Sequence, residues 1–218
     1  MFTLKEAMSI LIATIVFTFV ITFNKIFQKG GLTLEFALVA LLIAFAILMI
    51  NIITKKIIAK TMDSSIEHKI LEWQRWGFYE RSYTKYPIPI GVLLPFVIAV
   101  LFQGYFYVLV FLKFDVAPSL GRVRKAVGLY RFSDMTENQE GWIAGWGIIL
   151  TLIAAVAGYL IGGQYFLMFS RISIYYAFWN IIPISKLDGA KLFFGSLIGW
   201  EIIASICLIA LGYAFFLI

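Results

Sequence analysis

The sequence predicts an all-α polytopic membrane protein, and two observations lead to this prediction: its composition and the length of its apolar runs. The chain has 218 residues, of which 62% are hydrophobic and 14% are charged, whereas globular domains are about half apolar and about a quarter charged. The apolar residues are gathered in runs of roughly 20 residues, the length that crosses the core of a bilayer. A soluble fold would have to bury all these runs in one small core, so we expect an integral membrane protein.

Six apolar runs are predicted to form transmembrane helices within a single domain, residues 1–218. They are residues 7–23, 34–53, 90–112, 142–161, 165–182 and 198–218. Polar loops over residues 54–89 and 113–140 separate the second, third and fourth spans. Six spans would place both termini on one side of the membrane. We expect a multi-pass protein in the plasma membrane of a prokaryote.

The first polar loop contains a small interfacial segment near residues 64–80. Its partial alternation of apolar and polar residues, rich in Ile and Trp, favours short strands or a hairpin over a helix. Trp73 and Trp76 are equally compatible with an irregular loop that anchors at the level of the lipid headgroups. The sequence leaves both interpretations open.

The charged residues indicate a lipid bilayer as the main partner. The net charge is +6, but no basic run is long and no stacking motif accompanies one, so we expect no nucleic-acid partner. Arg171, early in the fifth predicted span, is expected to extend its guanidinium towards the headgroups. Cys207 is the single cysteine, which excludes a disulfide framework and a thiolate metal site.

The stretch that follows the fifth span, residues 180–189, reads N-I-I-P-I-S-K-L-D-G. Asp188 places a carboxylate near membrane depth, where a charge is costly unless another group pairs with it. A proline and a glycine in the same stretch prevent one helix from running straight through. The partner of Asp188 is therefore the central question about function.

This stretch resembles the N-x-x-P-x-x-x-L-D-G motif of the site-2 protease family, the intramembrane zinc metalloproteases. The matching positions are Asn180, Pro183, Leu187, Asp188 and Gly189. The resemblance implies that Asp188 stands at the position of the third zinc ligand. It also implies a groove in which the family binds a transmembrane segment of its substrate.

The other half of such a zinc site, H-E-x-x-H on an earlier membrane helix, is missing from the chain. In that motif two histidines on one helical face bind zinc, and the glutamate activates the attacking water. The only histidine of the chain, His68, lies outside every predicted span. Where the resemblance places the motif, Asn51 and Lys55 occupy the histidine positions and Ile52 the glutamate position. We therefore predict no catalytic residue, no bound metal and no cofactor.

A lysine at the second histidine position suggests a physical replacement for the zinc ion. We hypothesise that the ammonium of Lys55 pairs with Asp188 and that Asn51 is a hydrogen-bonding neighbour of this pair. In the alternative, Lys55 extends to the headgroups and Asp188 caps a helix that begins near Ala190.

The sequence thus favours a catalytically inactive pseudoprotease that resembles site-2 proteases and binds a transmembrane helix of another protein. One alternative is an active intramembrane metallopeptidase with an atypical zinc site, in which His68 or Glu67 joins Asp188. A second alternative is a structural or solute-handling membrane protein in which residues 180–189 only shape a broken helix.

Overall fold

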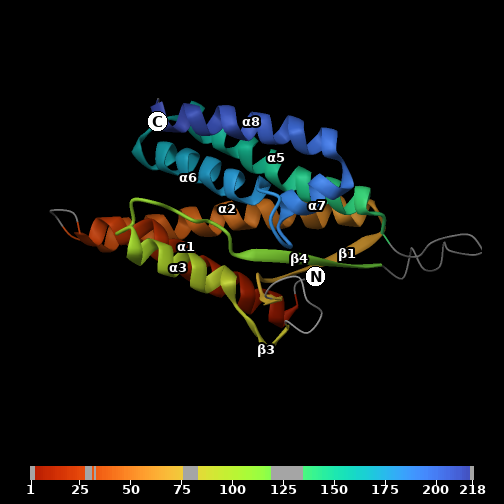
Figure 1. Cartoon of the computed structure of the whole chain (residues 1–218). Coiled ribbons are helices and arrows are strands. Elements are labelled where there is room, and N and C mark those ends of the chain that lie inside the picture. The colour runs from red at the N-terminus through yellow and green to blue at the C-terminus, as the bar shows by residue number, and fades with distance from the viewer. Residues whose placement is uncertain (1–2, 28–30, 32, 76–82, 119–134, 217–218) are drawn as a thin grey trace, which may run out of the picture.

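The computed structural model describes residues 3–27, 31, 33–75, 83–118 and 135–216, and Figure 1 shows how their helices and strands are arranged. The helices are α1 (Leu4–Phe27), α2 (Leu34–Thr61), α3 (Ile90–Leu101), α5 (Glu137–Ile161), α6 (Gln164–Ile181), α7 (Asp188–Gly195) and α8 (Leu197–Phe216). The strands are β1 (Ser64–Ile70), β2 (Trp73–Arg75), β3 (Tyr83–Ile88) and β4 (Leu112–Pro118).

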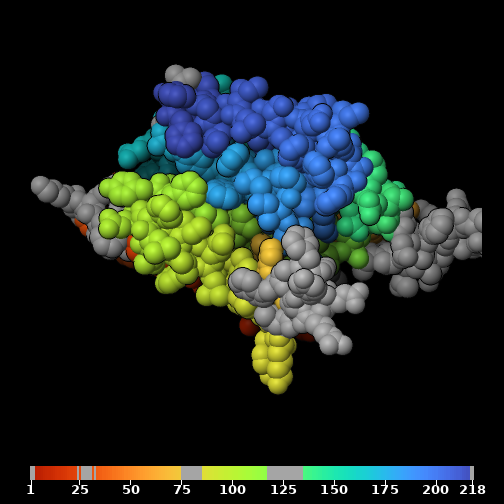
Figure 2. Space-filling view, viewed as in Figure 1, coloured from red at the N-terminus to blue at the C-terminus, as the bar shows by residue number. Residues whose placement is uncertain are grey.

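Four of the described helices, α1, α2, α5 and α8, are long and apolar enough to cross a membrane. Figure 2 shows α8 (blue) and α3 (yellow-green) on the outer surface of the molecule. Their exposed large apolar side chains include Leu93, Phe96, Val97, Leu101, Ile198, Ile202, Ile206 and Ile209. A surface of this kind is stable in contact with lipid, which supports the prediction of a helical membrane protein.

The prediction of a third span over residues 90–112 is wrong. Helix α3 ends at Leu101, and Gln103 and Gly104 both have positive φ angles, 51° and 74°, which the helix cannot continue. The chain then continues without a helix through residues 105–111 and enters β4. Apolar composition does not distinguish a buried extended segment from a helix, which explains the error.

The two polar loops are also shorter in the structure than the sequence predicted. Helix α2 ends at Thr61 rather than at residue 53, because Thr54 and Lys55 are buried on the helix instead of facing solvent. The second loop contains β4, which was not predicted, and α5 begins at Glu137 rather than at residue 142. Helix α6 covers most of the fifth predicted span, but it is not among the four apolar helices.

Two small antiparallel sheets confirm the strand interpretation of the first polar loop over most of its described part. Strand β1 pairs with β4 from Ser64 opposite Pro118 to Ile70 opposite Leu112. Strand β2 pairs with β3, with an irregularity between Trp73 and Arg75. Trp76 lies outside the described residues. The β1–β4 sheet packs beside α1 and α2 at one end of the helices (Figure 1).

The start of α1 and the end of α8 lie at opposite ends of the bundle, not on one side as six spans required. Figure 1 shows the start of α1 near β1 and β4 and the end of α8 at the far end of the bundle. Helix α6 runs back along α5, whereas α3 is only 12 residues long. A 12-residue helix extends about 18 Å, too short to cross the core of a bilayer of about 30 Å.

Candidate functional site

Lys55 and Asp188 form a buried ion pair between α2 and α7. The Nζ atom of Lys55 lies 2.5 Å from Oδ2 of Asp188 and donates a hydrogen bond to it. The two residues are only 3% and 2% exposed. The contact that the sequence suggested is therefore present, although 133 positions separate the two residues. Each charge satisfies the other where water does not reach them.

The connection between α6 and α7 places the Asp188 carboxylate in this position. Asp188 is the first residue of α7, where the positive end of the helix dipole favours a carboxylate. Leu187 is the N-cap residue, and no side-chain hydrogen bond caps the helix, so the alternative in which Asp188 caps this helix is not what the structure has. A Cβ atom on Gly189 would overlap the carbonyl oxygen of Ile181. Glycine at this position therefore allows α7 to pack against the end of α6.

The remaining motif positions support the same connection rather than the ion pair. Asn180 is buried near the end of α6, and its Nδ2 atom donates to the Tyr176 carbonyl oxygen at 2.8 Å. Pro183 is exposed just after α6, whereas Leu187 is buried. These residues fix the chain direction between the two helices.

Asn51 lies one helical turn before Lys55 on the same face of α2, as predicted. It is 1% exposed, and within the described part of the chain its Nδ2 atom has no hydrogen-bond partner. The Asn51 amide nitrogen therefore does not donate to the ion pair. Gly147 of α5 faces both side chains, because a Cβ atom there would lie 2.6 Å from Lys55 Cε and 3.1 Å from Asn51 Nδ2.

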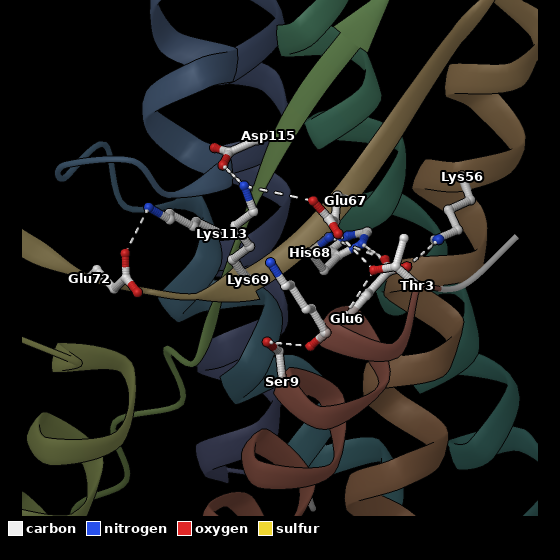
Figure 3. Close-up of polar contacts among 11 residues, drawn as sticks. Thr3, Glu6, Ser9, Lys56, Glu67, His68, Lys69, Glu72, Lys113 and Asp115 are labelled. Carbon is white, nitrogen blue, oxygen red and sulfur yellow. Dashed lines mark hydrogen bonds and ion pairs between the residues drawn. The ribbon is translucent and has the colours of Figure 1, made fainter. Parts of the chain in front are cut away.

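A second buried polar cluster joins α1, α2 and β1, and Figure 3 shows its three members, Glu6, Lys56 and His68. Oε1 of Glu6 contacts His68 Nδ1 at 3.0 Å and accepts from the His68 backbone N–H at 3.1 Å. Oε2 of Glu6 accepts from Lys56 Nζ at 2.6 Å. Glu6 and His68 are each 1% exposed. The cluster attaches the start of α1 to the sheet.

Burial dominates the electrostatics of His68. It lowers the pKa of the imidazole below its usual value, while the hydrogen bond with Glu6 acts in the opposite direction. The Lys55 ammonium lowers this pKa further, and the Asp188 carboxylate raises it. The two polar clusters therefore interact electrostatically across the base of the bundle.

The alternation of β1 separates His68 from Glu67. Adjacent strand residues point to opposite faces, so His68 is buried while Glu67 is partly exposed and accepts a hydrogen bond from Thr3 Oγ1 at 2.6 Å (Figure 3). The Nε2 atom of His68 is buried and has no hydrogen-bond partner among the residues that the structure describes. Glu6 was not predicted as its partner, although an acidic residue at the start of an apolar run is a signal that can be recognised.

The arrangement at the motif does not fit a zinc ion. Zinc sites in proteins need deprotonated nitrogen, sulfur or oxygen ligands, usually four in all with water included. Here the donors are the Asn51 amide and the Asp188 carboxylate, and the Lys55 ammonium already contacts that carboxylate. In the described ranges no group of three or more His, Cys, Asp or Glu side chains gathers as a metal site would require.

A cavity of about 340 Å³ is separated from the ion pair by Phe114, whose ring centroid lies 5.2 Å from Lys55 Nζ. It is lined by Phe114, Asp115, Glu137, Glu140, Ser185, Lys186, Ala190, Lys191 and Phe194. Lys191 Nζ donates to the Phe114 carbonyl oxygen at 2.6 Å and lies 3.3 Å from Oε2 of Glu140. The cavity therefore has walls from β4, α5 and α7 and carries charges of both signs.

Comparisons with known proteins do not test the resemblance of residues 180–189 to the site-2 protease motif. No family model, no curated protein and no solved structure matches the chain.

Proposed function

We propose that this chain is a catalytically inactive relative of the site-2 proteases that binds a transmembrane segment of another protein without cleaving it. The observation that carries the proposal is the ion pair between Lys55 and Asp188. The Lys55 ammonium pairs with Asp188, whose carboxylate stands where the family has a zinc ligand. An ammonium group cannot activate water for hydrolysis as a metal ion does. We also propose that the protein resides in the plasma membrane of a prokaryote.

The partner segment would bind at the cavity that Phe114 separates from the ion pair. Phe194, which lines the cavity, is 73% exposed, and Ile198 on the adjoining turn of α8 is 71% exposed. These apolar side chains suit the side of a membrane helix, and Lys186 and Glu137 suit the polar residues at its end. A polar side chain at the end of a partner helix would therefore reach into the cavity, while the helix itself packs on the exposed apolar side chains of α7 and α8.

Site-specific photocrosslinking in native membranes tests partner binding. A photoreactive residue at exposed Ser185, in the cavity, is expected to give a discrete adduct with an intact membrane protein. The matched control is Ile209, which is 74% exposed on α8 away from the cavity and is expected to crosslink mainly lipid. Identical adducts from both positions, or a cleaved partner in the Ser185 adduct, would contradict the proposal.

The main competing function is an active metallopeptidase, and one observation favours it. Glu6 contacts Nδ1 of His68, which is how a carboxylate orients a metal-binding imidazole, and no described residue hydrogen-bonds to Nε2. Metal analysis of the purified protein separates the two functions. Stoichiometric zinc that is lost in both Asp188→Ala and His68→Gln would favour the metallopeptidase and contradict the pseudoprotease with its metal-free site.

A further inference from the structure

A second cavity, of about 460 Å³, lies between α1, α6 and the extended segment that precedes β4. Its lining residues are Ile21, Lys25, Phe36, Tyr107, Leu109, Gln164, Tyr165, Leu167, Met168, Arg171, Ile172 and Tyr175. Its volume is within the range of about 300–1,000 Å³ that is typical of ligand sites. Phe36 and Lys55 are separated by roughly 28 Å along α2, so this cavity is distinct from the ion-pair site.

The walls of this cavity are fixed and mostly apolar. The Tyr107 carbonyl oxygen accepts a hydrogen bond from Trp179 Nε1 at 2.5 Å, which holds the extended segment against α6. The Tyr107 and Tyr175 rings stack with their centroids 6.2 Å apart. A ligand in this cavity must therefore present hydrocarbon to most of its surface.

Two cations, Lys25 and Arg171, line the same cavity without a carboxylate partner in the described part of the chain. The Nε atom of Arg171 is buried and makes no hydrogen bond to any described residue. The nearby carboxylate of Glu35 instead accepts a hydrogen bond from the Tyr165 hydroxyl at 2.8 Å. A charged group at membrane depth is costly unless an opposite charge satisfies it, so the cavity favours an anion.

Arg171 lies near the start of α6 and lines the same cavity as Lys25. Arg171 lies two turns along α6, roughly 10 Å from Gln164 at its start. Helical side chains point back towards the N-terminus of their helix, so the guanidinium extends towards the end of the bundle where Lys25 lies. In a bilayer, this arrangement would place the two cations towards the headgroups and the apolar walls deeper in the membrane.

We propose that this cavity binds one anionic lipid. The anionic oxygen group, a carboxylate or a phosphate, contacts Arg171 with Lys25 at the entrance, and one acyl chain lies against Ile172 and Tyr175. A transmembrane helix is about 10–12 Å wide and does not fit this volume, and a hydrophilic metabolite would leave the apolar walls uncovered. The proposal does not depend on the pseudoprotease function.

Thermal unfolding of the full chain in a neutral maltoside detergent tests the site with three probes. Oleate supplies a carboxylate and phosphatidylglycerol supplies a phosphate. Zwitterionic phosphatidylcholine, which has no net charge, is the control. We expect at least one anionic lipid to raise Tm in a saturable, concentration-dependent way, while phosphatidylcholine does not. The lipid that binds identifies whether the anion is a carboxylate or a phosphate.

Two variants and a control locate the binding. Arg171→Gln is expected to weaken binding of the anionic lipid roughly tenfold or more, since it removes a charge-assisted hydrogen bond. Leu167→Trp keeps the arginine but fills the cavity, and it is expected to abolish binding. The control Lys69→Gln removes an exposed cation on β1 and is expected to bind normally.

Three results would overturn the proposal. The first is equal stabilisation by phosphatidylcholine and by the anionic lipids, and the second is no saturable binding of any of them. The third is wild-type affinity in a folded Leu167→Trp variant. If Arg171→Gln does not fold, Arg171→Lys, which retains a cation, replaces it in the binding measurement.

Discussion

Lys55 and Asp188 form a buried ion pair whose disruption is expected to lower the free energy of unfolding. Lys55→Met leaves a buried carboxylate without a counter-ion, and we expect it to destabilise the protein by about 3–5 kcal/mol. Asp188→Asn is also expected to lower the free energy of unfolding. The double variant removes both charges and should lose less than the sum of the single variants. Denaturant unfolding in detergent measures these differences.

An exposed ion pair provides the matched control for this cycle. Lys69 lies 2.9 Å from Asp115, and both side chains are nearly half exposed. Exposed pairs contribute about 0–1 kcal/mol, so Lys69→Met should change stability far less than Lys55→Met. Equal effects of the two substitutions, or strictly additive losses in the double variant, would show that the buried pair has no special role.

His68 makes stability depend on pH. Its pKa in the folded protein is lowered by burial, with Glu6 and Asp188 opposing this effect and Lys55 adding to it. The unfolded chain therefore takes up a proton first, near pH 6.5. Stability is complete above this pH and falls as the pH decreases towards the lowered pKa of the folded state.

The measurement for His68 is Tm between pH 7.5 and pH 5. Wild-type protein should lose stability over this interval, and His68→Gln, which cannot titrate, should show a smaller slope. Because Gln can still donate to Glu6, the substitution changes the proton uptake more than the hydrogen bonding. An identical slope in both proteins would exclude His68 as the titrating group.

At the scale of the helices, Gly147 determines how closely α5 approaches α2. A Cβ atom at this position would lie 2.6 Å from Lys55 Cε, and the ion pair prevents Lys55 from moving away. Gly147→Ala is therefore expected to destabilise the protein by about 1–3 kcal/mol through overpacking. Gly212→Ala on α8 is the control, because nothing lies within 4 Å of its added Cβ atom. Thermal unfolding of the two variants should give a loss only at Gly147.

The extended segment between α3 and β4 is also determined by its surroundings. Its backbone lies among helices, where unpaired carbonyl groups would be costly. The Phe111 carbonyl oxygen accepts from the Leu71 N–H at 2.9 Å, and Trp179 Nε1 donates to Tyr107. Residues distant in the sequence thus stabilise a non-helical conformation in an apolar stretch that otherwise predicts a helix.

At the scale of the whole molecule, the arrangement of the helices predicts the sides on which the two ends lie. Figure 1 places the start of α1 and the end of α8 at opposite ends of the bundle. In a Cys207→Ala background, Lys5→Cys and Phe216→Cys should react with a membrane-impermeant maleimide from opposite sides of sealed vesicles. Reaction from the same side would support the six-span arrangement and contradict this fold.

The sequence by itself determined the class of the protein and only suggested the partners of its central contact. The lengths and composition of the apolar runs predicted a helical membrane protein, because the thickness of the bilayer sets the length of a spanning helix. The resemblance of residues 180–189 to the site-2 protease motif, together with the absence of a second histidine, suggested Lys55 as the partner of Asp188. The first inference needed only composition and the length of the apolar runs, whereas the second also needed the resemblance of a motif.

Only the tertiary structure decided the path of residues 102–118, the pairing of β1 with β4 and the partner of His68. Each of these depends on groups far apart in the chain that satisfy one another's hydrogen bonds or charges. A membrane helix and a buried strand are both rich in apolar residues, so the sequence alone does not decide between helix and strand for an apolar run. Long-range contacts settle it, because a buried polar group must find its partner wherever the fold places one.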